Sequence, residues 1–468
     1  MRSPLFRKLR SFADSPVSMT EGPILPAMLF FALPIMMGTL LQQLYATVDT
    51  IILGRFVGKT AIAAVGGSDA ILIYLLVDFF VGVCSGASII VSQFYGAENA
   101  RGVLKSIRSA MFLSAVIGAF CTAAGILVAP KCLSLLDTPT ETMQYSRDYL
   151  VWYFAGMIPA MIYNMGSSIL RALGDSRRPL YFLIFSCGLN VILDLVFVVG
   201  FRLEVRGAAM ATSLSQLICA ILVLRTLFHP ARNEDAERSD WIPDGRLIRS
   251  MVLLGIPMGL QSSMYNITNL FITKAVNRLS TDAIAAWAIQ NKFDSFFWPA
   301  GNAIAIAVMT FAGQNYGARK PDRIRRSVRC GAALYASFGA VYSIFILSVG
   351  PSLVPLFSDD PNVAVFVRQF LYGISWGYIC FTFASIIPSA MRGTGNTVMP
   401  AVITLFGACL LRLIILFSYT FPHLSPASVC ICYPPTWIMT SILFLIYYRF
   451  FRWMPPFPED SAELAAQP

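Results

Sequence analysis

The chain has 468 residues, of which 56% are hydrophobic and only 13% are charged. Soluble domains carry about twice that share of charged residues, so the composition excludes an ordinary soluble protein and indicates a membrane protein with several spans. The formal charge of +10 is spread over short loops between apolar stretches. This distribution is typical of membrane topology, and we expect no nucleic-acid partner.

Twelve apolar stretches are long enough to cross a bilayer as helices, because about 20 residues span a hydrocarbon core of about 30 Å. We therefore predict an all-α membrane protein with twelve transmembrane helices. The predicted spans lie near residues 25–53, 66–92, 107–130, 147–172, 179–200, 207–228, 247–275, 284–312, 328–350, 364–391, 400–421 and 427–449.

The polar stretches between and around the spans predict the orientation. Residues 1–24 contain no apolar leader segment, and 229–246 form a charged linker at mid-chain. Most of the 35 Lys and Arg residues fall on the side of the membrane that holds residues 1–24. The positive-inside rule therefore places the tails, 1–24 and 451–468, in the cytoplasm and the protein in the cell inner (plasma) membrane.

The two halves of the chain resemble each other. Three short motifs recur in the same order with a shift of 221 to 223 residues: SQFYGA at 92–97 and GQNYGA at 313–318, LRALGDSRRP at 170–179 and MRGTGNTVMP at 391–400, and ALPIMMG at 32–38 and GIPMGLQ at 255–261. We therefore predict two parallel six-helix lobes, 25–228 and 247–450, related by a pseudo-two-fold axis along the membrane normal. Transporters built in this way bind their substrate between the repeats.

An amide and a carboxylate lie one helical turn apart in the fifth span. Asn190 and Asp194 are at positions i and i+4, so they share one helix face. An aspartate at the centre of a membrane helix costs about 2.5–3.5 kcal/mol on insertion scales, so its presence indicates a functional or structural role. The oxygens suit Na⁺, and the carboxyl group equally suits a carried proton. A structural hydrogen bond between helices is the alternative to a transport role.

The repeat and its motifs resemble the multidrug and toxic compound extrusion (MATE) family of transporters. The resemblance covers about residues 25 to 450 and depends on the six-plus-six layout, the paired Q-x-Y-G-A loops and the paired R-x-x-G loops. It implies a secondary active exporter that exchanges amphipathic cations for H⁺ or Na⁺ by alternating access. Such a protein works without a cofactor, is not an enzyme and functions as a monomer in the lipid bilayer.

Within that family the chain is similar to the DinF-like branch. That branch has an aspartate in span 1 and Asn-x-x-x-Asp in span 5, which match Asp49, Asn190 and Asp194 here. The resemblance also implies a polar partner at Thr212 and a helix bend at Pro34. NorM-like members carry acids in spans 7 and 10, and this chain has none there. We therefore expect the ion-coupling site, or metal site if the ion is Na⁺, in the N-terminal lobe.

Other polar and aromatic residues in the spans are candidates for a substrate cleft. Asp78 is predicted either to line the interior of the lobe or to face the cleft, and Lys292 and Asp294 form either a local ion pair or substrate contacts. Arg412 either extends its charge toward the interface or neutralises an acid. The cleft candidates are Met36, Gln42, Tyr45, Asp78, Tyr265, Asn269, Lys292 and Asp294.

Two other functional classes fit the sequence less well than drug efflux. A lipid-linked saccharide flippase of related architecture would need counter-charges for a pyrophosphate, and only Lys292 and Arg412 are basic within the spans. A membrane enzyme is disfavoured because the sequence has no phosphate-binding loop, and its two histidines stand alone. We predict a transporter of small drug-like molecules.

Overall fold

The computed structural model describes residues 19–66, 68–135, 138–229 and 242–457, and within these ranges the secondary structure is helical, with no strand. In the first half of the chain the helices are α2 (Ile24–Phe56), α3 (Lys59–Gly66), α4 (Ser68–Gly96), α5 (Ala100–Leu135), α6 (Thr140–Ala155), α7 (Met157–Ala172), α8 (Arg177–Asp194), the π-helix η1 (Leu195–Gly200) and α9 (Glu204–Leu227).

The second half of the chain is also built from helices, several of which are interrupted. They are α11 (Gly245–Val276), α12 (Thr281–Gly317), α13 (Pro321–Leu353), η3 (Val354–Leu356), α14 (Pro361–Ile374), η4 (Ser375–Phe381), α15 (Thr382–Gly393), α16 (Val398–Thr404), η5 (Leu405–Leu410), α17 (Leu411–Ile415), η6 (Leu416–Thr420), α18 (Pro426–Ile431) and α19 (Pro434–Phe450).

The helices account for the twelve predicted spans. Within the described residues, ten are long and apolar enough to cross a membrane by length and composition alone. The predicted span 247–275 is α11, which has 32 residues but has a lower mean hydropathy because of polar residues between Gln261 and Asn269. The remaining predicted span, 147–172, is divided at Gly156 into α6 and α7, and each of these has 16 residues and is therefore too short to be counted alone. The all-α architecture predicted from the sequence is confirmed.

The chain divides into two compact units that exchange the beginnings of their first helices. Unit 1 contains residues 37–259, and unit 2 contains residues 19–36 and 260–457. Helix α2 therefore starts in unit 2 and continues in unit 1, and α11 starts in unit 1 and continues in unit 2. Each change of unit follows a proline, Pro34 or Pro257, by two residues. The lobe limits 25–228 and 247–450 describe the sequence repeat and remain a prediction.

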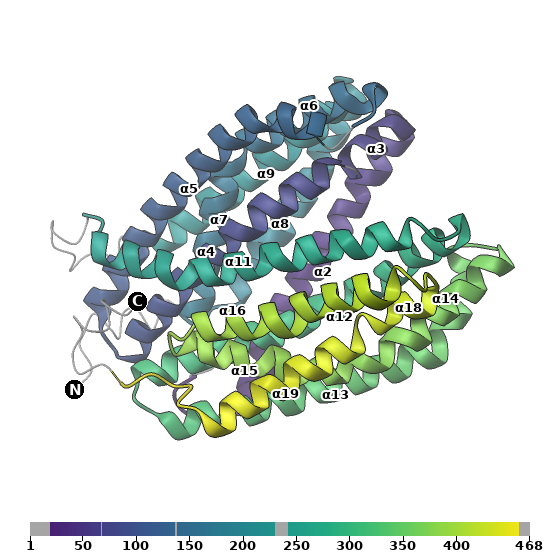
Figure 1. Cartoon of the computed structure of the whole chain (residues 1–468). Helices are drawn as coiled ribbons and strands as arrows, with labels where there is room; N and C mark the ends of the chain where they lie inside the picture. Colours follow the sequence, from purple (N-terminus) through teal and green to yellow (C-terminus); the bar gives the residue numbers. More distant parts are fainter. Residues whose placement is uncertain (1–18, 67, 136–137, 230–241, 458–468) are drawn as a thin grey trace. The chain divides into compact units, whose positions relative to one another are not determined.

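Within unit 1, glycines allow the start of α11 to approach α4 closely. A Cβ atom on Gly82 would lie 2.5 Å from the Cα atom of Gly259, and one on Gly86 would lie 2.7 Å from the backbone nitrogen of Gly255. No side chain fits between two helix backbones at that distance, so the crossing depends on glycine. Elsewhere in this unit α7 packs between α5 and α9, which Figure 1 shows side by side.

Unit 2 is organised around the long helix α12. Helices α13, α14 and α15 pack against it, and α19 packs against α15. Aromatic rings fill this interior: Phe297 of α12 stacks on Tyr378 of η4 with ring centroids 4.2 Å apart. The outer faces are apolar instead of polar, as on Val341 and Phe345 of α13, which are exposed. An apolar exterior is what a helix in contact with lipid presents.

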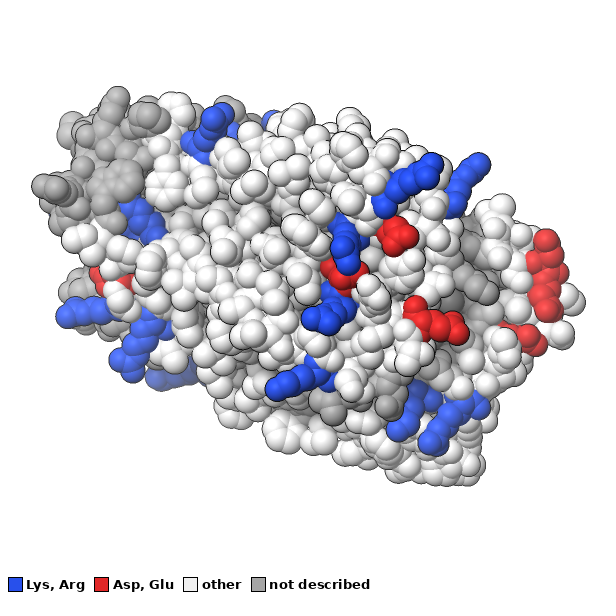
Figure 2. Space-filling model, turned by 90° about the horizontal axis from the view of Figure 1, so that it is seen from above, with Lys and Arg blue, Asp and Glu red and all other residues white. Residues whose placement is uncertain are grey.

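Charged side chains are sparse on the face drawn in Figure 2, where uncharged residues cover most of the described surface. The few Lys and Arg residues lie singly or in small groups, some of them beside an acidic residue. A soluble protein needs a mixed-charge surface for solubility, whereas a protein in a bilayer needs charges only where it meets water or a headgroup. The surface therefore agrees with the composition in indicating a membrane protein.

Candidate functional site

Two acidic side chains from different helices meet inside unit 1. Asp49 lies on α2 and Asp194 is the last residue of α8, immediately before the π-helix η1. Their carboxyl groups lie next to each other. Asp194 is fully buried, and neither of its carboxyl oxygens accepts a hydrogen bond from a donor among the described residues. Two adjacent carboxylates repel each other strongly at low dielectric, so the pair needs a shared proton or a bound cation.

Asn190 and Thr212 lie beside this pair. With its amide group turned to satisfy its neighbours, Asn190 donates from Nδ2 to Oδ1 of Asp49 over 3.0 Å. Its Oδ1 then accepts a hydrogen bond from the backbone nitrogen of Thr212 over 3.3 Å. The network of partners decides this amide orientation. Thr212 was expected as a polar partner, and the contact that the structure shows is made by its backbone.

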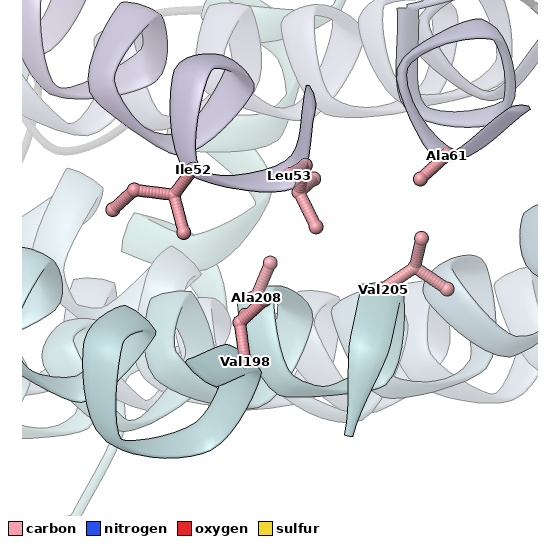
Figure 3. Close-up of a cluster of buried hydrophobic side chains, with 6 residues drawn as sticks. All are labelled: Ile52, Leu53, Ala61, Val198, Val205 and Ala208. Carbon is pink, nitrogen blue, oxygen red and sulfur yellow. The ribbon is translucent and has the colours of Figure 1, made fainter. Parts of the chain in front are cut away.

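A hydrophobic cluster holds these helices together one turn away from the acids. Ile52 and Leu53 follow Asp49 on α2, Val198 follows Asp194 on η1, and Ala208 precedes Thr212 on α9. Figure 3 shows their side chains pointing toward one another, together with Ala61 of α3 and Val205 of α9. Because packing on this cluster sets the spacing of α2, η1 and α9, it also sets the spacing of the polar groups one turn earlier or later.

Asp49 also lines a cavity of about 520 Å³ that lies wholly within unit 1. The volume falls in the range of about 300–1,000 Å³ that small-molecule sites occupy. Among the described residues, its wall combines tyrosine rings, amide side chains and aliphatic groups, with Asp49 as its acid and no Lys or Arg. The lining residues are Gln42, Tyr45, Ala46, Asp49, Thr50, Leu53, Ile62, Val65, Ile73, Val77, Tyr149, Tyr153, Gly156, Met157, Ala160, Asn164, Ala208, Thr212, Ser213 and Gln216.

The cavity contains functional candidates that the sequence argument missed. Tyr149 and Tyr153, one turn apart on α6, stack with ring centroids 5.8 Å apart. Asn164 and Gln216 bring amide groups from α7 and α9 to the wall. The spacing of the tyrosines and the presence of amides in apolar spans were visible signals. Neither signal says which way the side chains face, and this depends on how the helices pack.

The predicted cleft residues divide between the two units. Gln42 and Tyr45 line the cavity of unit 1. Asp78 is half-buried on α4 in the same unit but is not among the lining residues, and it has an interaction partner. The other candidates, Met36, Tyr265, Asn269, Lys292 and Asp294, belong to unit 2.

Asp294 does not form the ion pair with Lys292 that the sequence offered as one possibility. It accepts hydrogen bonds from the hydroxyl group of Tyr378 and from Nε2 of Gln290, the latter over 3.0 Å. The side chain of Lys292 is exposed. The two residues are only two positions apart, so on a helix they point in different directions. Within the described part of the chain, Asp294 is therefore held by neutral donors alone.

Arg412 does not extend its charge to the surface, and within the described part of the chain it pairs with no acid. It is 2% exposed, and its Nε donates to the carbonyl oxygen of Cys432 over 3.2 Å. The guanidinium group also lies over the ring of Tyr433, 4.5 Å from the centroid. Cys432 is the C-terminal cap of α18, where carbonyl groups lack helical partners and the helix dipole is negative. Arg412 thus stabilises the break between α18 and α19.

Comparison with known proteins assigns the family. The family model MatE matches this chain twice, over residues 34–196 and 257–418, one match for each predicted repeat. The chain belongs to the MatE family. The predicted resemblance to MATE transporters is therefore confirmed, and with it the assignment to membrane transport.

Two relatives of this MatE protein are named as probable multidrug resistance proteins. A "probable multidrug resistance protein YoeA" of Bacillus subtilis is 27% identical over 91% of this chain and 93% of its own length. A "probable multidrug resistance protein YpnP" of the same organism is 28% identical over 93% and 97%. A solved structure of a "multidrug resistance MATE family transporter" in an outward-facing conformation has a TM-score of 0.84 and 20% identity, covering 96% of this chain and 98% of that chain. The fold of twelve transmembrane helices in two lobes is shared.

Proposed function

We propose that this MatE protein exports amphipathic organic cations from the cell in exchange for H⁺ or Na⁺. The observation that carries the proposal is the pair formed by the half-buried Asp49 and the fully buried Asp194, of which Asp49 lies on the wall of a drug-sized cavity. Asn190 and the backbone of Thr212 complete the ion-coupling site. The names of the relatives support multidrug efflux as the transport class.

Competition for Asp49 would couple the two fluxes. When a proton or Na⁺ binds between Asp49 and Asp194, it reduces the negative charge facing the cavity, and a bound organic cation loses its counter-charge and is released. When the ion leaves, the carboxylate pair attracts the next cation. Exchange requires that ion and substrate do not bind together, and a single carboxylate shared by both provides this exclusion.

The cavity wall suits a flat or flexible organic cation. Tyrosine faces attract cations, and Tyr45, Tyr149 and Tyr153 all line the cavity. Gln42, Asn164 and Gln216 offer hydrogen bonds that adapt to different ligands. Small aliphatic groups accept the apolar part of an amphipathic molecule. We expect the unit 2 candidates, among them Tyr265 and Asp294, to contact the substrate at another stage of the cycle.

A lipid-linked saccharide is a poorer match to this cavity. Its pyrophosphate would need arginine or lysine side chains as counter-charges, because these bind phosphate through charge-assisted hydrogen bonds. No Lys or Arg is found among the lining residues that the structure describes, and Asp49 would repel the ligand. We therefore propose drug efflux by a monomer in the plasma membrane, with both termini in the cytoplasm.

The test uses the purified full-length protein in proteoliposomes loaded with the fluorescent cation ethidium. An inward H⁺ gradient and an inward Na⁺ gradient are imposed separately, and ethidium efflux is followed by fluorescence. We expect one of the two gradients to accelerate efflux, and Asp49→Asn to abolish the acceleration. Equal efflux with and without both gradients would refute ion-coupled export.

A further inference from the structure

The segment that leads into α2 is bound by side chains from the connection between α12 and α13. Residues 19–22 precede the first turn of α2, and each of their backbone carbonyl oxygens accepts a hydrogen bond from Asn315, Lys320 or Arg323. The bonds are Asn315 Nδ2 to Met19 at 3.1 Å, Lys320 Nζ to Thr20 at 3.0 Å, and Arg323 to Met19, Glu21 and Gly22 at 3.1, 3.3 and 3.0 Å.

The donors of this carbonyl clamp, Asn315, Lys320 and Arg323, are linked to one another and to the core of unit 2. Arg323 Nε donates to Oδ1 of Asn315 over 3.2 Å, and Nδ2 of Asn315 also donates to the carbonyl oxygen of Phe311 over 2.8 Å. Asn315 is fully buried, and the side chain of Met19 is 3% exposed. Backbone carbonyls outside a helix need partners, and the clamp supplies them at four consecutive positions.

Two of the three clamp donors have no counterpart at the matching positions of the first copy of the sequence repeat. Asn315 lies in the GQNYGA motif, and a shift of 221 residues places Phe94 at the same position of the first copy, with Gly102 opposite Arg323. In unit 1 the ring of Phe94 packs against Gly102, where a side chain would clash. An asparagine and an arginine at these two positions are therefore not needed to build this loop, which forms without them in the first repeat.

What the clamp holds is the half of α2 that lies in unit 2. Residues 19–36 belong to this unit, and from residue 37 onward α2 belongs to unit 1, where it carries Asp49. The change follows Pro34, which interrupts the backbone hydrogen bonding of the helix and lets it bend. One end of α2 is thus fixed by the clamp, and the other end carries a carboxylate of the candidate ion site.

We propose that Asn315, Lys320 and Arg323 are positioning residues for transport: they fix the start of α2 to unit 2, so that movement of this unit bends α2 at Pro34 and acts on the segment that carries Asp49. The inference rests on the proposed function for its transport measurement. It assigns no substrate contact to the three residues. Without the clamp, the site that contains Asp49 still binds the ion and the substrate, but α2 no longer follows unit 2 through the transport cycle.

The test compares Arg323→Gln with Arg325→Gln in the full-length protein. Arg325 is a matched control, because it lies on the same helix and its side chain is 59% exposed in a weak pair with Asp322 at 3.8 Å. We expect Arg323→Gln to raise hydrogen–deuterium exchange in residues 19–30 by about tenfold, since the segment opens locally. Efflux should fall about fivefold while the dissociation constant for ethidium stays within about twofold, because the clamp touches no ligand. Arg325→Gln should change none of these.

Three results would overturn the proposal. Unchanged exchange would show that the clamp does not hold the segment, and raised exchange with wild-type efflux would show that transport does not need the clamp. Loss of ethidium binding together with efflux would indicate a general structural defect. If Arg323→Gln does not insert, Lys320→Gln gives the same three measurements. Ion-driven ethidium efflux by the wild-type protein tests the proposed function separately. If the wild type shows no such efflux, the proposed function fails, whatever the variants do.

Discussion

Changing Asp194 to Asn should uncouple transport while leaving the fold intact. Asparagine has nearly the size of aspartate, and its amide group can donate to the carboxyl group of Asp49, which already accepts from Asn190. The buried site would then hold one carboxylate instead of two adjacent ones. Because this removes a repulsion at low dielectric, we expect the melting temperature of Asp194→Asn to equal or exceed that of the wild type.

The size of the expected loss follows from one charge moved per cycle. One elementary charge crossing 100 mV supplies about 2.3 kcal/mol, and one unit of pH difference adds about 1.4 kcal/mol. Together, about 3.7 kcal/mol sustains a gradient of about five-hundred-fold for a neutral drug. For a monovalent cation exchanged one for one, the charges cancel and only the pH term remains, which gives about tenfold. If a proton bound at Asp194 is the coupling ion, the concentration ratio across the membrane should fall to about one in Asp194→Asn, for the neutral drug and for the cation alike.

The assay measures the steady-state ethidium gradient across proteoliposomes with imposed H⁺ or Na⁺ gradients. Asp148→Asn is the matched control: it also removes a carboxylate from unit 1, but one that pairs with Arg206 over 2.8 Å at the surface. Such an exposed pair is worth about 1 kcal/mol or less, so this variant should transport normally. The reasoning is refuted if Asp194→Asn builds the same ion-driven gradient as the wild type, and the carboxyl group would then be only a structural partner.

Three further changes test the bend, the helix crossing and the buried arginine. Pro34→Ala should insert and bind ethidium normally but slow its efflux, because α2 regains a hydrogen bond at the expected bend; efflux at the wild-type rate would exclude a role for the bend. Gly86→Ala should lower the free energy of unfolding by about 1–3 kcal/mol, and with it the melting temperature, because its methyl group meets the backbone of Gly255. Gly188→Ala, with nothing within 4 Å, should be neutral, and equal melting of both variants would contradict the close crossing. Arg412→Leu removes the guanidinium donor from the carbonyl oxygen of Cys432, which keeps only the hydroxyl group of Thr436 at 3.1 Å, and should cost about 1 kcal/mol without changing ion coupling; loss of coupling at normal stability would point to a role in transport.

The sequence by itself determined the class of the molecule and half of the candidate ion site. Hydropathy and the shift of 221 to 223 residues were enough for twelve spans and a repeat, because a bilayer admits few structures other than helices of fixed length. The spacing of Asn190 and Asp194 placed both on one helix face, since helical periodicity is local. The match of Asp49 depended on the family resemblance, because nothing local relates residues 49 and 194.

Tertiary structure alone decided which side chains meet. Tyr149 and Tyr153 could have faced lipid, and only the packing of α6 turns them into the cavity beside Asp49. Asp294 accepts a hydrogen bond from Tyr378, which is far away in the sequence, and does not pair with the lysine two residues away. The exchange of helix segments between the units, with the clamp that holds residues 19–22, has no signature in periodicity or composition. Periodicity reports which residues share a face of one helix, whereas these contacts depend on how that face packs against helices from elsewhere in the chain.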